Sequence, residues 1–146
     1  MDNLMGTMLA PLIALVAWTF VVWGWLFAVR IPAIARLKVD VQKAADDPGS
    51  QPQLPVSARR VGNNYNHLHE QPTLFYALAL ALEVMGQAHP INVALAWGYV
   101  ASRVLHSLVQ GTINIIPLRF ALFVLGSLIL MALTLHGAMA LLHHHS

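Results

Sequence analysis

The residues between Arg59 and Glu70 have the types and spacing to bind a charged ligand. A helical wheel of about 100° per residue places four of them within roughly 60° of one another, with two more on one flank. The four are Arg59, Asn63, Asn66 and Glu70, and the flanking residues are Arg60 and His67. Arginines can hold carboxylates, asparagine amides can pair with peptide groups, and Glu70 can accept from an amine. The face predicts either a site for a peptide-like anion or hydrogen bonding between helices.

A second group of polar residues forms a stripe on a later helix. Its members fall within about 100° of the wheel, in a segment otherwise rich in Val, Leu and Ala. They are Tyr99, Arg103, His106, Ser107, Gln110 and Asn114. In lipid such a stripe must face protein or a cavity, and Arg103 needs an anionic partner. Glu70 is the internal candidate for that partner, and such an ion pair can also border a ligand site.

Arg119 is the third candidate, because it follows Pro117 at the expected start of the last helix. The N-terminus of a helix already favours anions, and an arginine there strengthens the preference. The alternative is that Arg119 anchors the helix at the lipid headgroups.

Metal and triad chemistry are not predicted. His67 and His69 would point about 200° apart on a helix, so one metal ion would not reach both. There is no cysteine, and no aspartate lies near the later helices to complete a Ser-His-Asp set. The terminal His143 to His145 is set aside as a solvated end or a tag remnant. A further face carries Tyr65, His69, Tyr76 and Glu83, for which packing is favoured over catalysis.

The elements that must position these residues are membrane helices. Hydrophobic residues make up 58% of the chain and charged residues 10%, against about 25% charged in an average soluble domain. Long uncharged runs predict one all-α domain of four transmembrane helices in an up-down-up-down bundle, kinked just before Pro72. The predicted spans are residues 8–29, 61–85, 91–112 and 118–142, with a polar loop at 30–60.

Charge placement predicts the topology. The loop holds six of the eight lysines and arginines, so the positive-inside rule puts it in the cytoplasm and both termini on the other side. This topology suits the inner membrane of a bacterium. The net charge of +2 is too small to indicate a nucleic-acid partner.

Three motifs give the chain a resemblance to a known family. They are the segment from Arg59 to Phe75 with its run Glu70-Gln71-Pro72-Thr73-Leu74-Phe75, the run Ser102-Arg103-Val104-Leu105-His106-Ser107, and Ile116-Pro117-Leu118-Arg119. The chain resembles the membrane-associated proteins in eicosanoid and glutathione metabolism, the MAPEG family. The resemblance implies a homotrimer in the lipid bilayer, with glutathione bound between subunits near the cytoplasmic side. It also implies that Glu70, Arg103 and Arg119 contact glutathione and that His106 lies beside the arginine of the third helix.

The chain also departs from the family pattern. Asn66-His67 stands where glutathione-using members carry Arg-Asn, and Asn63 replaces an arginine of the same face. Phe123 stands where members place a tyrosine or arginine that addresses the thiol, and its ring cannot donate a hydrogen bond. Two functions stay open. One is a glutathione transferase or peroxidase for lipophilic electrophiles with Arg119 as the catalytic residue; the other is a non-catalytic trimer that holds a lipid or another anion.

Overall fold

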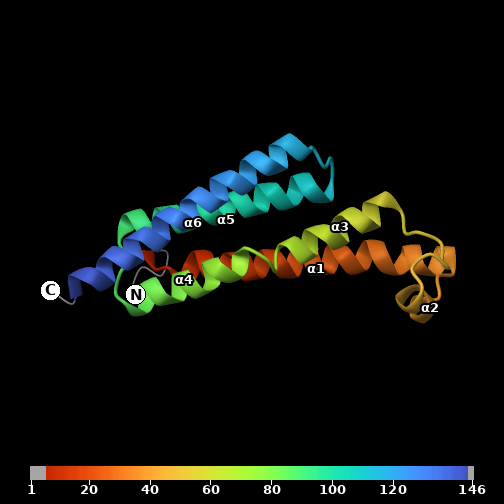
Figure 1. Ribbon diagram of the computed structural model, residues 1–146, viewed down its shortest axis with the longest axis horizontal. Coiled ribbons are helices and arrows are strands. Elements are labelled where there is room, and N and C mark those ends of the chain that lie inside the picture. The colour runs from red at the N-terminus through yellow and green to blue at the C-terminus, as the bar shows by residue number, and fades with distance from the viewer. Residues whose placement is uncertain (1–5, 145–146) are drawn as a thin grey trace.

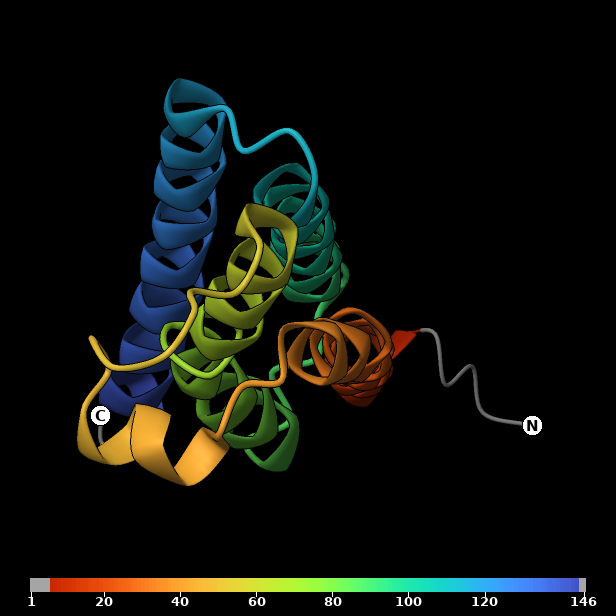
Figure 2. The same cartoon turned by 90° about the vertical axis from the view of Figure 1, so that its right-hand side faces the viewer.

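The computed structural model describes residues 6–144, which fold into helices with no strand in that range. The elements are α1 (Leu9–Leu37), α2 (Val41–Asp46), α3 (Val56–His67), α4 (Pro72–Val84), α5 (Pro90–Gly111) and α6 (Ile116–His144). Figure 1 shows α3 and α4 running end to end along α1, with the hairpin of α5 and α6 packed beside them. Seen end-on, α1 and α6 lie on opposite sides of the column formed by α3 and α4 (Figure 2).

The first helix extends beyond the predicted span. It continues past Arg30 and through Pro32 to Leu37, so the expected loop start at residue 30 is wrong. Basic residues change the solvent preference of a helix but do not break its backbone hydrogen bonds, which explains the difference. The helix ends where Lys38 adopts a left-handed conformation with a φ of 51°. The N–H of Val39 then donates to the carbonyl of Ile34 at 3.1 Å, which closes the last turn.

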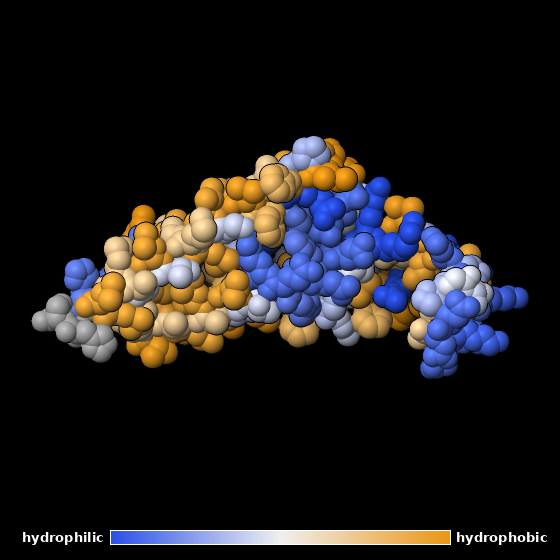
Figure 3. All heavy atoms as spheres, viewed as in Figure 1, coloured by the Kyte–Doolittle hydropathy of each residue, from blue (hydrophilic) through white to orange (hydrophobic). Residues whose placement is uncertain are grey.

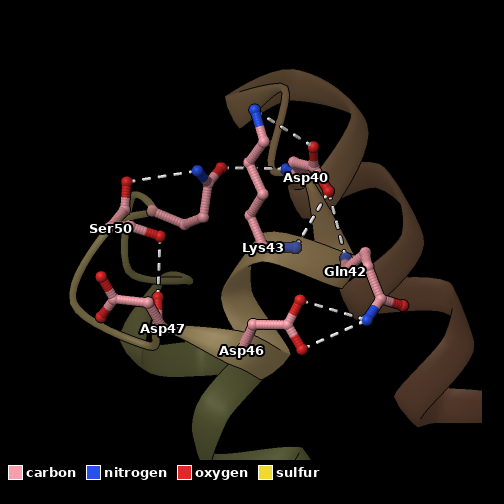
Figure 4. A network of polar contacts seen from close by, with 7 residues as sticks. Asp40, Gln42, Lys43, Asp46, Asp47 and Ser50 are labelled. Atoms are coloured by element: carbon pink, nitrogen blue, oxygen red, sulfur yellow. Dashed lines mark hydrogen bonds and ion pairs between the residues drawn. The ribbon is translucent and has the colours of Figure 1, made fainter.

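The polar loop contains its own short helix, α2, held by local hydrogen bonds (Figure 4). The Asp40 side chain caps α2 by accepting from the backbone N–H groups of Gln42 and Lys43, both at 3.1 Å. The backbone N–H of Asp40 donates to the side chain of Gln51 at 3.0 Å, which ties the two ends of the loop together. Of the residues that connect α1 to α3, only Leu54 lines either of the two pockets described below.

The predicted second span is two helices rather than one. Residues 68–71 are not α-helical and separate α3 from α4. The expected kink before Pro72 is therefore a break in the helix. Proline has no N–H, so the carbonyl four residues earlier loses its partner. The chain tightens instead, and Glu70 N–H donates to His67 at 3.3 Å while Thr73 N–H donates to Glu70 at 3.2 Å. Because of this break, the residues of α4 do not continue the helical phase of α3.

Apolar side chains are exposed along α1 and α6. Within the described residues, two helices are long and apolar enough to cross a membrane, at Leu9–Leu37 and Ile116–His143. Only 22% and 17% of their most apolar windows are buried, so they are not the core helices of a soluble protein. The other two predicted spans do not pass the same test, because α4 has 13 residues and α5 carries the polar stripe.

The packed core occupies the end of the molecule away from the loop. There the rings of Phe75 and Tyr99 stack with centroids 4.6 Å apart, and both are fully buried. Glu83 accepts a hydrogen bond from the backbone N–H of Met8 at 2.7 Å, which ties the end of α4 to the start of α1. Figure 3 shows the division on the surface, with apolar atoms over one half and hydrophilic atoms over the loop and α3. Of the terminal histidines, His145 lies outside the described residues.

Candidate functional site

Three arginines converge beside α3 at the loop end of the molecule. A cavity of about 390 Å³ is lined by Arg30 of α1, by Arg59 and Arg60 of α3, and by asparagine side chains. We call it the arginine pocket. Its asparagines are Asn63, Asn66 and Asn114. No aspartate or glutamate is among its lining residues, so the pocket concentrates positive charge and favours an anion.

The arginines of this pocket lack anionic partners within the described residues. Arg60 donates to the backbone carbonyl of Thr112 at 2.8 Å, which holds α3 against the end of α5. Its Nε is buried and has no hydrogen-bond partner. Arg59 is exposed and reaches only the amide oxygen of Gln53, at 3.3 Å. Their donors are therefore available to a ligand that carries carboxylates.

A second cavity lies between α3, α5 and α6. It has a volume of about 280 Å³, and we call it the histidine pocket. Its lining residues are His67, His106, Ile116, Arg119, Phe120 and Phe123. The imidazole rings of His67 and His106 stack with centroids 4.8 Å apart, and the ring of Phe123 lies 5.9 Å from that of His67. Ring packing fixes the two imidazoles far more firmly than the long side chains of the arginine pocket.

Glu70 and His67 form a hydrogen bond beside the histidine pocket. The distance between Glu70 Oε2 and His67 Nδ1 is 2.7 Å. The side chain of Glu70 is 64% exposed and that of His67 is 21% exposed. The other ring nitrogen, His67 Nε2, is buried and has no hydrogen-bond partner. The carboxylate therefore accepts a hydrogen bond from one side of the imidazole, and the other nitrogen lies among packed rings without a hydrogen-bond partner.

Arg119 connects the two pockets through Asn114. Its Nη1 donates to Asn114 Oδ1 at 2.7 Å, while its buried Nε has no partner. Asn114 has a φ of 54°, a left-handed conformation that asparagine adopts more readily than most residues. In this conformation Asn114 both lines the arginine pocket and holds the arginine of the histidine pocket. The connection between α5 and α6 thus fixes the distance between the pockets.

The predicted pairing of Arg103 with Glu70 is wrong. Arg103 is buried, with 1% of its surface exposed, and it donates to the side-chain oxygen of Gln71. Gln71 in turn donates to Ser127 Oγ of α6 at 2.8 Å. Arg103 of α5 is therefore connected to α6 through Gln71. The physical reason is the break at residues 68–71, which turns Gln71 toward α5 and α6 and leaves Glu70 on the outside. No carboxylate in residues 6–144 pairs with Arg103.

The guanidinium of Arg103 is enclosed by rings and by a close helix contact. It lies over the ring of Tyr99 at 5.1 Å and over that of Phe123 at 5.3 Å, which stabilises the cation in a dry environment. A Cβ atom at Gly126 would lie 2.6 Å from Arg103 Nη2. Glycine at this position therefore lets α6 approach the arginine. Arg103 acts as a structural centre between α5, α6 and the break, and it lines neither pocket.

The predicted site residues do not form one site, because they lie in two separate pockets or in neither. Arg59, Asn63 and Asn66 line the arginine pocket, whereas His67, His106 and Arg119 line the histidine pocket. Sequence reasoning placed Arg30 only in the polar loop, although an arginine at the polar end of a membrane helix signals a position near the headgroups. It also missed Asn64, which is buried and donates to Ser107 Oγ at 2.7 Å between α3 and α5.

Comparison with known proteins gives one match. The sequence matches the MAPEG family over residues 8–139, which is nearly the whole chain. No curated protein and no solved structure matches it. The family match and the two exposed apolar helices agree with the resemblance carried by the motifs around Glu70, Arg103 and Arg119. The chain is therefore a membrane protein that belongs to the MAPEG family.

Proposed function

We propose that the protein binds glutathione in the arginine pocket and conjugates or reduces lipophilic electrophiles in the histidine pocket. The observation that carries the proposal is the junction of the two cavities at Asn114 and Arg119. One cavity offers cations for a charged peptide. The other offers an arginine next to apolar rings, where a thiol and a lipophile can meet.

The arginine pocket matches the charges of glutathione. This tripeptide carries two carboxylates, one ammonium and two peptide groups at neutral pH. Arg30, Arg59 and Arg60 supply guanidinium donors for the carboxylates, and such charge-assisted bonds are about twice as strong as neutral ones. The amides of Asn63 and Asn66 can pair with the peptide groups. Glu70 stands outside the pocket's lining and accepts from His67 instead, so we assign it no contact with the tripeptide.

Arg119 is the group proposed to stabilise the thiolate. A free thiol with a pKa of about 8.5 is mostly protonated at neutral pH, and each unit of lowering needs about 1.4 kcal/mol of thiolate stabilisation. Arg119 lies in the first turns of α6 with a buried Nε that has no partner. The N-terminal end of a helix dipole adds to its positive potential. Phe123 offers no donor there, so Arg119 is the main source of stabilisation.

The lipophilic substrate enters from the membrane side of α6. Phe120 and Ile116 line the histidine pocket and are 67% and 70% exposed. Exposed apolar side chains of this size favour contact with lipid. In this proposal the polar loop faces the cytoplasm, and a second copy in a homotrimer covers part of the open cavities, as the family resemblance implies.

The test uses detergent-purified protein. A glutathione titration by calorimetry is expected to give saturable binding at or below millimolar concentration. The protein should then conjugate a chlorodinitrobenzene-type electrophile, and Arg119→Ala should remove the activity. Absence of turnover above the uncatalysed rate with several electrophiles would overturn the catalytic part of the proposal.

A second candidate is a non-catalytic protein that holds a lipid or another anion in the arginine pocket. The ring of Phe123 favours it, because this position lacks a donor for a thiol. The same titration separates the two functions. Binding of anionic-lipid micelles without binding of millimolar glutathione would support the second candidate.

A further inference from the structure

The orientation of His67 suggests a specific role within the proposed reaction. Its Nδ1 is 2.7 Å from the Glu70 carboxylate, and its Nε2 is buried without a hydrogen-bond partner in the wall of the histidine pocket. A carboxylate that accepts from Nδ1 fixes the tautomer in which Nε2 is the basic nitrogen. The carboxylate also stabilises the imidazolium that forms when Nε2 takes a proton. Glu70 and His67 thus have the geometry of a base and its orienting group.

We propose that His67 is the general base that removes the thiol proton of glutathione, and that Glu70 is its positioning residue. This inference rests on the proposed function and adds a proton acceptor to the cation, Arg119, that stabilises the thiolate. The two residues adjoin the helix break, which leaves Glu70 free of Arg103 and turned toward His67. Their spacing of three residues places the two side chains next to each other at the end of α3.

Other groups near the pocket do not fit the role. His69 is two residues away, but its Nδ1 contacts the carbonyl of Tyr65 and its ring lines a different cavity, between α1 and α4. His106 is 4% exposed and lies beneath the ring of His67, without a carboxylate partner in the described residues. The guanidinium of Arg119 has donors and no acceptor atom, so it can stabilise an anion but cannot act as the base.

Several charged groups face His67 from the elements packed around it. Glu70 is the anionic one, in direct contact at 2.7 Å. The cations are Arg119 from α6, Arg103 from α5 behind the shared ring of Phe123, and Arg60 and Arg30 across α3 in the arginine pocket. His106 is the remaining titratable neighbour. The direct contact with Glu70 is the shortest of these, so it is expected to dominate.

The reaction balances with these groups. His67 Nε2 takes the proton as the S–H bond breaks, and Arg119 holds the thiolate. The thiolate sulfur forms a bond to the electrophilic carbon, and the carbon–halogen bond breaks to release halide. The imidazolium then returns its proton to water, so the net products are the thioether, halide and one proton. Glu70 orients His67 and takes no part in the proton transfer.

The experiment compares His67→Gln with His69→Gln, a matched change on the same segment whose side chain faces another cavity. Glutathione binding is measured by calorimetry, and thiolate formation on the bound ligand is followed by its ultraviolet absorbance as a function of pH. In His67→Gln, we expect conjugation at saturating glutathione to fall about 100-fold or more. The pH midpoint for thiolate formation should rise by about one unit toward that of the free thiol, near 8.5. His69→Gln should match the wild type.

Glu70→Gln provides a second variant, because the amide keeps the shape and removes the charge. It should lower conjugation by about tenfold and shift the same midpoint in the same direction, by less than His67→Gln. Wild-type rate and midpoint in both variants, with glutathione still bound, would overturn the role of His67 and leave the proposed function standing. Failure of the wild-type protein to bind glutathione would instead overturn the proposed function, and this inference with it.

Discussion

The arginine pocket and the histidine pocket are neighbours, but different kinds of side chain line them. The arginine pocket is lined by long side chains, and Arg59 is exposed. The histidine pocket is lined by stacked rings, and its two unpartnered nitrogens, on His67 and Arg119, are buried. Long side chains adapt to a ligand at an entropic cost, whereas packed rings hold a fixed geometry. The contrast suggests that one pocket supplies affinity and the other supplies chemistry.

The chain makes this division with a few shared residues. Asn66 faces the arginine pocket while its neighbour His67 faces the histidine pocket, because successive helix residues point about 100° apart. Asn114 and Arg119 repeat the arrangement at the connection between α5 and α6. Substitutions in one pocket should therefore change rate and those in the other should change affinity.

The largest effect is expected for Arg119→Ala. Removing a group that stabilises developing negative charge costs about 100- to 1,000-fold in turnover. Conjugation rate at saturating glutathione should fall by this factor, while the dissociation constant measured by calorimetry changes much less. Arg119→Lys keeps the charge and should recover part of the rate. An equal loss of rate and affinity would contradict the assignment of turnover to one pocket and of binding to the other.

Gly126→Ala should damage the scaffold behind the histidine pocket. The added Cβ would lie 2.6 Å from Arg103 Nη2 and 3.1 Å from Ser102 Oγ, and Arg103 is enclosed on all sides. Overpacking of this kind costs about 1–3 kcal/mol of unfolding free energy. Thermal unfolding in detergent measures it. Gly24→Ala is the control, since a Cβ there meets nothing within 4 Å; equal melting temperatures for the two variants would contradict the tight contact.

Arg59→Ala should weaken glutathione binding without changing turnover. The side chain is exposed and its one hydrogen bond goes to Gln53, so we expect a modest loss of about 0.5–1.5 kcal/mol, or about 2- to 13-fold in the dissociation constant. Calorimetry and saturation kinetics measure the two quantities separately. Arg36→Ala, a basic residue of α1 that lines neither pocket, controls for the change in net charge. A fall in the maximal rate for Arg59→Ala would show that Arg59 takes part in the chemical step and not only in binding.

The smallest effect should come from salt. Raising the ionic strength from about 0.02 M to 0.5 M shortens the screening length to below 10 Å and weakens attraction between exposed charges. Glutathione affinity should fall by about two- to fivefold, because the arginine pocket is open to solvent. The rate at saturating glutathione should hold constant, since buried groups are screened less. A salt-dependent maximal rate would show that the histidine pocket is also solvated.

A helical wheel through residues 59–70 predicts the neighbours of some site residues correctly and those of Glu70 incorrectly. It placed Arg59, Asn63 and Asn66 on one face, and they do share a pocket. It failed for Glu70, because a wheel holds only while the helix is continuous and residues 68–71 break it. The pattern around Pro72 predicted a disruption, but its rotation could not be read from the sequence, since it depends on how Gln71 and Arg103 pack against α6.

Residue types and their order along the chain are enough to establish the class of the protein and the kinds of side chain at its site. Apolar runs and sparse charge predict membrane helices whatever their packing, and the motifs around Glu70, Arg103 and Arg119 identify the family. The tertiary structure decided which of those residues meet. Hydrogen bonds such as that between Arg103 and Gln71 depend on side-chain directions within a few ångströms. Those directions are set by helix packing and by one break in the backbone, which residue spacing alone does not encode.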